Sequence, residues 1–344
     1  MKTILYAYDL VENDNEYVKR MVEITSRLES VEVIASLAEF WNPSRTYDFI
    51  VINWPDYLFD WRVRLSDEDY YKAESQVNFY QSKGTKLINI RHDAYPHTDK
   101  SKNAIRLYDL FNVKSAYILH LGEFSVKEYC SVYGKIDNQQ HLVIPHVLFK
   151  EFNFGLRNTK DLRLKYGYQP NDFIVFVPGN IRSYQEFKSA IALYRRMKIR
   201  HKKLLFQNMK EAHFAKKGFT IQYLVRLIKR FYHQIIKVDY LTGKKTSEEL
   251  SELFAIADLV FISRTDNLNS GNITLAAQFN KPIVAIETGN VTEWIKKLNQ
   301  NLILKSDLKN NSTIELSYNK SENLIDELAN DEIILNELKK IVAS

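Results

Sequence analysis

Short apolar runs alternate with amphipathic stretches along the first half of the chain. The apolar runs predict strands at residues 2–8, 31–36, 46–55, 85–92, 116–121 and 141–146. Apolar residues at helical spacing predict helices at residues 16–28, 69–84, 103–114 and 125–134. Strands that alternate with helices are typical of a parallel sheet covered by helices. We therefore expect a doubly wound domain over residues 1–150.

The same plan begins again after an irregular stretch at 147–170. A strand from residue 172 is expected to break at Pro178-Gly179, and further apolar runs predict strands at 202–209, 235–241, 258–263, 283–286 and 301–305. Helices are predicted between these strands and at the end of the chain. We expect an α/β protein with two Rossmann-like domains facing across a cleft. The second spans 151–320, and the helices in 321–344 are expected to pack back on the first domain.

A polar turn between the strand at 258–263 and the following helix is the strongest local signal. It contains Asn269, Ser270, Gly271 and Asn272. The start of a helix carries unpaired N–H groups and a partial positive charge, so this turn could hold a phosphate. A glycine there lets the backbone approach such a ligand closely. A helix start that is merely capped by its polar residues is the alternative.

Other polar and aromatic side chains follow strands, where ligands of such sheets bind. Arg182 follows the strand that begins the second domain, and its guanidinium matches two phosphate oxygens; a surface salt bridge is the alternative. In the first domain Asp9, Trp54 and Tyr57 follow strands and could contact a sugar, although the two aromatic residues could equally pack the strand exit.

The loop after the strand at 85–92 contains His92, Asp93 and His97. His92 or Asp93 could deprotonate a hydroxyl held within hydrogen-bond reach, and His97 could instead shape the loop. The three together could also suggest a metal site, but no further ligand pattern accompanies them. We therefore predict an acid–base site here and no metal.

Composition limits the remaining choices. The chain has 344 residues, 45% of them hydrophobic and 26% charged, which is typical of a globular protein. Its single cysteine excludes an intramolecular disulfide framework. No apolar run approaches the length of a membrane span, and the first residues do not resemble a signal peptide. We expect a cytosolic protein.

Positive charge is concentrated in the second half of the chain. Residues 1–150 hold 18 Lys and Arg against 21 Asp and Glu, whereas residues 195–237 alone hold 13 basic residues and one acid, Glu211. Within this stretch Phe219, Tyr223, Leu227 and Phe231 are helically spaced, so 213–237 could be an in-plane helix at the inner face of the cell membrane. Packing on its own domain or on a second subunit is the alternative. No recognised nucleic-acid-binding motif is present, and the sequence does not define the oligomeric state.

Five stretches in order resemble landmarks of bacterial glycosyltransferases of the two-Rossmann (GT-B) architecture, in particular family-4-like enzymes of surface-polysaccharide assembly. These stretches are DNEYVKRMVEI, YDFIVINWPDYL, INIRHDAYPH, FVPGNIRSYQEF and the LNSG turn. In the second and third, Asn53, Asp56 and Asp93 replace histidine, glutamate and asparagine of the family pattern. In the fourth, Gly179, Ile181, Arg182 and Tyr184 match, whereas Gln185 replaces a lysine and Glu186 a glycine.

The resemblance implies a hexosyltransferase that uses a nucleotide diphosphate sugar and a saccharide or lipid-linked acceptor. The donor would lie against Gly179, Arg182, the turn at 269–272, Tyr240 near the base and Glu293 near the ribose. Arg182 and the helix start would carry the diphosphate charge without a metal or other cofactor. Gln185 and Glu186 motivate an alternative, a non-catalytic saccharide-binding partner of another transferase, and a nucleotide-sugar epimerase is a third possibility.

Overall fold

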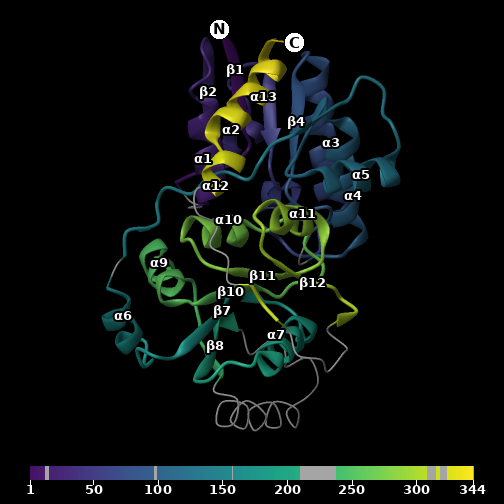
Figure 1. Ribbon diagram of the computed structural model, residues 1–344. Coiled ribbons are helices and arrows are strands. Elements are labelled where there is room, and N and C mark those ends of the chain that lie inside the picture. Colours follow the sequence, from purple (N-terminus) through teal and green to yellow (C-terminus); the bar gives the residue numbers. More distant parts are fainter. Residues whose placement is uncertain are drawn as a thin grey trace. The chain divides into compact units, whose positions relative to one another are not determined.

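The computed structural model describes residues 1–11, 15–96, 99–156, 158–209, 238–307, 315–317 and 324–343. They form two compact units, one of Met1–Phe149 with Leu328–Ser344 and one of Lys150–Glu327. We call them unit 1 and unit 2. Each contains its own six-stranded parallel sheet with helices packed on it (Figure 1). This confirms the predicted fold class of two Rossmann-like domains.

Unit 1 has the strand order β2-β1-β3-β4-β5-β6. The strands are β1 (Lys2–Tyr6), β2 (Val31–Ala35), β3 (Phe49–Ile52), β4 (Lys86–Arg91), β5 (Tyr117–His120) and β6 (Gln140–Val143). Its helices are α1 (Glu16–Thr25), α2 (Leu37–Trp41), the 3-10 turn η1 (Pro55–Phe59), α3 (Asp67–Ser82), α4 (Lys102–Lys114), α5 (Glu123–Tyr133) and α13 (Asp331–Ala343). The short helix α2 and the turn η1 are not predicted by the apolar pattern.

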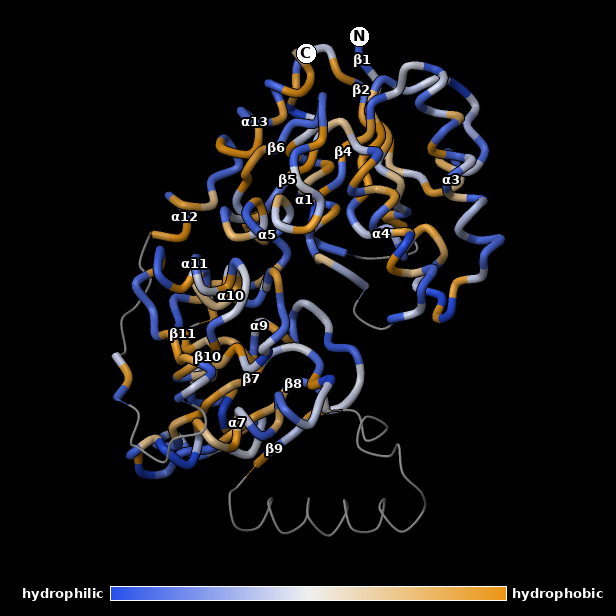
Figure 2. Tube along the Cα trace, turned by 90° about the vertical axis from the view of Figure 1, so that its right-hand side faces the viewer, coloured by the Kyte–Doolittle hydropathy of each residue, from blue (hydrophilic) through white to orange (hydrophobic). Residues whose placement is uncertain are grey.

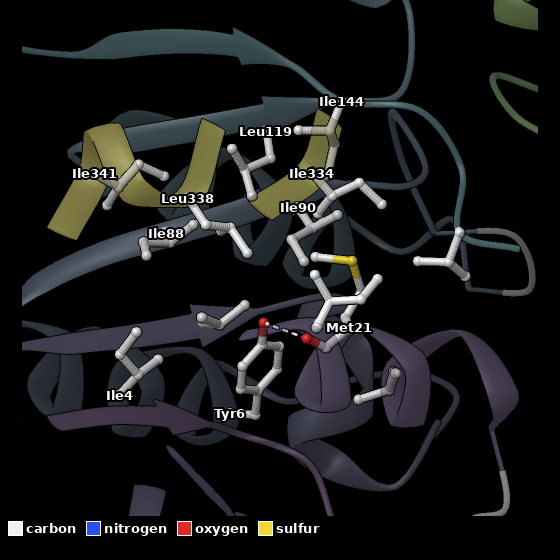
Figure 3. Packing of buried hydrophobic residues seen from close by; sticks show 14 of the residues in the cluster. Ile4, Tyr6, Met21, Ile88, Ile90, Leu119, Ile144, Ile334, Leu338 and Ile341 are labelled. Atoms are coloured by element: carbon white, nitrogen blue, oxygen red, sulfur yellow. Dashed lines mark hydrogen bonds between the residues drawn. The ribbon is translucent and has the colours of Figure 1, made fainter. Parts of the chain in front are cut away.

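Both faces of the unit 1 sheet are buried, which explains the uninterrupted apolar runs of its strands. Along β1 and the residue after it, Ile4 and Tyr6 contribute to one core cluster, whereas Leu5 and Ala7 contribute to the other. The first cluster also contains α13, whose Ile334, Leu338 and Ile341 lie against β4 and β5 (Figure 3). The last helix of the chain therefore completes the core of the first unit.

Unit 2 has the strand order β12-β11-β10-β7-β8-β9. The strands are β7 (Phe173–Ile181), β8 (Lys202–Met209), β9 (Val238–Tyr240), β10 (Leu259–Ile262), β11 (Ile283–Ile286) and β12 (Asn301–Ile303). Its helices are α6 (Thr159–Lys165), α7 (Tyr184–Arg196), α9 (Ser247–Ile256), α10 (Gly271–Gln278) and α11 (Gly289–Lys297), and α12 (Leu324–Leu328) spans the boundary between the units. Figure 2 shows hydrophobic residues concentrated along β7 and β10, the centre of this sheet.

The predicted break at Pro178-Gly179 is wrong, because β7 continues through both residues to Ile181. The register of β7 against β8 shifts between Val177 and Asn180, so the strand accommodates the two residues with an irregularity and then resumes pairing. The extension carries the end of β7 to the residue before Arg182.

Candidate functional site

The end of β7 in unit 2 lies against the start of α10. Gly179 has a φ of +83°, and a Cβ atom there would lie 3.2 Å from Asn272 Nδ2. The Gly179 N–H donates to Gln207 Oε1 at 2.6 Å, which fixes the backbone in this conformation. A glycine is needed because the positive φ is unfavourable for other residues and the space is already tight. The structure thus brings the predicted residues Gly179 and Asn272 together.

Arg182 follows the last residue of β7 and lies just before α7, and its side chain is exposed. Its backbone N–H donates to Glu186 Oε2 at 3.0 Å, and the Glu186 N–H donates to Ser183 Oγ at 3.2 Å. Glu186 is a buried carboxylate whose Oε1 lies 3.9 Å from Arg264 Nε. Burial raises the pKa of Glu186, while the Arg182 N–H and the Arg264 guanidinium oppose the shift.

The polar turn before α10 is fixed by the start of the next helix, α11. Asn290 Nδ2 donates to Asn269 Oδ1 at 2.7 Å, and the Asn290 N–H donates to the Leu268 carbonyl at 2.8 Å. Thr288 Oγ1 donates to the Asn267 carbonyl at 3.1 Å. The Asn267 side chain is buried, and its Oδ1 has no hydrogen-bond partner among the residues described.

Ser270 occupies the N-cap of α10 with an extended backbone, followed by Gly271 as the first helical residue. Within the part of the chain described, the Ser270 side chain makes no capping hydrogen bond. The Ser270 side chain therefore does not cap α10. The start is positioned instead by the contacts to α11.

Two further predicted donor residues lie on other elements of unit 2. Tyr240 ends β9, the edge strand beyond β8, and its register partner is Phe206. Glu293 lies on α11, where Lys297 Nζ donates to its carboxylate at 2.6 Å. The structure therefore groups Gly179, Arg182, Asn269, Ser270, Gly271 and Asn272, whereas Tyr240 is two strands away from β7.

Unit 1 brings Trp54, His92 and Asp93 together at the ends of β3 and β4. Trp54 Nε1 donates to Asp93 Oδ2 at 3.1 Å, and the Trp54 and His92 ring centroids are 4.8 Å apart. Asp93 is buried and His92 is half-buried. A carboxylate held by an indole N–H beside an imidazole is suited to accept a proton from a nearby hydroxyl.

Tyr17 and His146 complete this group, and the sequence analysis did not select them. The ring of Tyr17 lies 4.8 Å from the rings of both His92 and His146. Burial, together with His92, lowers the pKa of His146 to about 3. His146 is therefore neutral at physiological pH, and its Nδ1 donates to the Val147 carbonyl at 3.0 Å. The run of histidines at strand ends was a signal that could have identified it.

Asp9 and Tyr57 form hydrogen bonds and ring contacts that position the loops around this group. The Asp9 carboxylate accepts the Leu37 N–H at 2.8 Å, at the start of α2, and the Asp9 N–H donates to Tyr57 Oη at 3.2 Å. The Tyr57 ring is buried and stacks on Tyr8 with centroids 4.0 Å apart. These contacts favour the packing interpretation of Tyr57.

His97 and the whole of the 213–237 segment, including its helically spaced apolar residues, lie outside the described residues. Among those that are described, no group of three or more His, Cys, Asp or Glu side chains could hold a metal ion. Likewise, no described helix is both long and apolar enough to cross a membrane.

Comparison with known proteins identifies the architecture. No family model matches the chain, and no curated protein matches its sequence. Among solved structures, HepE from Anabaena in complex with UDP-glucose is similar over 100% of both chains, with a TM-score of 0.64 and 14% identity. Sucrose-phosphate synthase from Thermosynechococcus elongatus is similar over 100% of this chain and 98% of its own, with a TM-score of 0.67 and 11% identity. The chain has the GT-B fold.

The GT-B fold does not by itself select a reaction. UDP-GlcNAc 2-epimerase from Methanocaldococcus jannaschii is also similar, over 100% of both chains, with a TM-score of 0.52 and 9% identity. Function must therefore be argued from the groups at the strand ends.

Proposed function

We propose that the protein is a glycosyltransferase that moves a hexosyl unit from a nucleotide diphosphate sugar to a saccharide or lipid-linked glycan acceptor. The observation that carries this proposal is the contact of the β7 end with the start of α10 in unit 2. It places Gly179 beside Asn272, three residues before the exposed Arg182. A guanidinium and a helix start suit the charge that grows on a leaving nucleoside diphosphate.

We assign the donor to unit 2 and the acceptor to unit 1. The similarity to HepE in complex with UDP-glucose favours a nucleotide-sugar donor. In unit 1, the Trp54–Asp93 hydrogen bond and the adjoining His92 ring supply a base for the acceptor hydroxyl. Trp54, which is half-buried, offers an indole face on which a sugar ring could stack.

Donor binding is tested first, by thermal shift and calorimetry with UDP, GDP and dTDP. Arg182→Ala should weaken binding of the preferred nucleotide by about tenfold or more, because a charge-assisted bidentate contact is lost. Arg200→Ala is a matched control, since Arg200 is an exposed arginine that precedes β8 and so lies at the opposite edge of the sheet. Equal binding by wild type and Arg182→Ala would remove the assignment of Arg182.

Catalysis is tested separately in unit 1. Asp93→Asn and His92→Ala should each lower turnover by about 100-fold while leaving donor affinity unchanged, since general base catalysis contributes about 10²–10⁴. Normal turnover in both variants would place the base elsewhere. We also propose that no metal is required, so activity should persist in EDTA.

A non-catalytic saccharide-binding role is a second candidate. It is favoured by the buried carboxylate of Glu186 next to the Arg182 backbone, because an anion there opposes a bound diphosphate. Failure of UDP, GDP and dTDP to bind would support this role. An epimerase would instead isomerise the donor without an acceptor.

Membrane contact through 213–237 remains a proposal from the sequence. Its basic and apolar residues suit the inner face of the cell membrane and a lipid-linked acceptor. Co-sedimentation with vesicles containing anionic lipid tests it. Equal binding to neutral and anionic vesicles would contradict the electrostatic part of the argument.

A further inference from the structure

We infer that Arg264 is the second cation, beside Arg182, that binds the diphosphate. Gln185, which stands where the family pattern has a lysine, is neutral and cannot supply this charge. The inference rests on the proposed function, because it concerns the same nucleotide. A nucleoside diphosphate carries more negative charge than Arg182 alone can balance. Gln185 is neutral, and Glu186 adds a buried negative charge.

The strand order places Arg264 near Arg182. β10 pairs in parallel with β7, so the residues that follow the two strands lie at the same edge of the sheet. In the loops that directly follow β7, β10 and β11, the basic residues before the next helix are Arg182 and Arg264.

Glu186 connects the two arginines. One carboxylate oxygen accepts the Arg182 N–H at 3.0 Å, and the other lies 3.9 Å from Arg264 Nε. The Glu186 side chain is 4% exposed and that of Arg264 is 17% exposed. Glu186 thus orients Arg264 toward the beginning of α7, where Arg182 lies, while some of the Arg264 side chain is accessible to a ligand.

Asp266, a second partner of Arg264, can be exchanged for a ligand. Arg264 Nη2 lies 3.2 Å from Asp266 Oδ1, and the Asp266 side chain is 67% exposed. An ion pair with an exposed carboxylate contributes little in water. A diphosphate has several oxygens and more charge, so it should displace Asp266, while Glu186 keeps the guanidinium in place.

Lys188 is the competing candidate, and its position is less suitable. It lies on the exposed side of α7, and its Nζ is 5.6 Å from the centroid of the Tyr184 ring. No contact with Glu186 is found for it among the described residues.

The test compares ligands that differ in phosphate charge. Whichever of UDP, GDP and dTDP binds best is titrated by calorimetry, alongside the monophosphate of the same base. Arg264→Gln should weaken diphosphate binding by about tenfold and monophosphate binding by less than about threefold. Arg264→Lys should keep most of the affinity, because it retains the charge. Lys188→Gln is the matched control and should bind as wild type does.

Asp266→Asn gives a prediction of opposite sign. Removing the competing carboxylate should tighten diphosphate binding by about twofold to fivefold. Arg264→Gln leaves Glu186 buried without this partner, so the double variant Arg264→Gln/Glu186→Gln removes both charges together. If Arg264→Gln fails to fold, the double variant should show the same selective loss of diphosphate affinity.

Several results would overturn the inference. These are unchanged diphosphate binding by the Arg264 variants, an equal loss for monophosphate and diphosphate, or a tenfold loss in Lys188→Gln. In those cases wild-type binding of a diphosphate would still support the proposed function. Failure of the wild type to bind any of the three diphosphates would instead overturn both.

Discussion

At the scale of single residues, two glutamates in the same position of their helices have opposite environments. Glu186 and Glu249 each lie three residues after the N-cap, in α7 and α9. Burial raises the pKa of Glu186, whereas the backbone N–H of Thr246 lowers the pKa of Glu249, whose side chain is 42% exposed. The two carboxylates should therefore affect stability with opposite dependence on pH.

Glu186→Gln should stabilise unit 2 at neutral pH relative to wild type, by about 0.5–2 kcal/mol, as is common for stabilising substitutions. A carboxyl whose pKa is raised on folding contributes stability that is fully present below its unfolded pKa, near 4.5, and is lost as the pH rises through the folded value. The advantage of the variant should therefore shrink toward pH 4. Urea unfolding at several pH values measures it.

Glu249→Gln is the matched control and should behave in reverse. Its carboxyl has a lowered pKa in the folded protein, so its stabilising contribution is present at neutral pH and is lost as the pH falls. A Glu186 variant that loses stability at neutral pH, as the Glu249 variant should, would show that the buried carboxylate is stabilised by its arginine neighbours.

The environment of Glu186 also shows where sequence reasoning stops. The sequence reveals that Glu186 stands at a position where the resembling family has glycine. It does not reveal that Arg264 faces it, because that contact depends on the pairing of β7 with β10 and on side-chain packing. The buried Asn267 is missed for the same reason, since an isolated Asn in a polar turn is usually exposed.

At the scale of elements, the turn before α10 depends on a single glycine at the start of α11. Gly289 has a φ of +44°, and a Cβ atom there would lie 2.5 Å from the Asn267 carbonyl oxygen and 2.6 Å from that of Leu268. Both neighbours are backbone atoms, so the turn itself would have to move. Such a movement would shift Asn269 and the start of α10.

Gly289→Ala should destabilise unit 2 by about 2–4 kcal/mol and weaken nucleotide binding, because it combines a strained φ with a steric clash. Gly243→Ala is a matched control, since Gly243 has a φ of +83° and nothing within 4 Å of the added Cβ. It should cost only the strain, about 1 kcal/mol, and keep nucleotide affinity. Thermal unfolding and calorimetry compare the two, and equal effects would show that the clash is relieved elsewhere.

The C-terminal helix α13 belongs to the core of unit 1. Leu338 is 3% exposed within the cluster that also contains Ile88 and Ile90. Leu338→Ala should therefore destabilise unit 1 by about 2–5 kcal/mol, as expected for a large-to-small change in a packed core. The neighbouring Lys339→Ala should change stability by less than about 0.5 kcal/mol, because Lys339 is exposed. Similar losses in both variants, measured by urea unfolding, would contradict the packing.

Elements with strong apolar patterns are those that the sequence predicts best. β3, β10 and β11 are short apolar runs buried along their whole length, and all three are found near the predicted positions. The five-residue helix α2 has too few residues to show a helical period. β7 continues through Pro178-Gly179 because its pairing with β8 shifts register there and then resumes. The local sequence pattern cannot show this, because the pairing depends on a strand elsewhere in the chain.

At the scale of the whole molecule, the two units have separate sheets and separate cores, and the proposal assigns the nucleotide to one of them. A ligand that binds the folded state alone stabilises it by RT ln(1 + [L]/Kd), about 2.7 kcal/mol at 100 times Kd. Amides of unit 2 that exchange only on unfolding should then exchange about 100-fold more slowly.

Hydrogen exchange with and without the preferred nucleoside diphosphate measures this. We expect the largest gain in protection in β7, β10 and the first turn of α10, since Gly179, Arg264 and Gly271 lie at their ends. Arg182→Ala at the same nucleotide concentration is the control and should lose most of the gain. Protection confined to unit 1 would show that the nucleotide binds there and not in unit 2. The roles proposed for the two sets of strand ends would then have to be reversed.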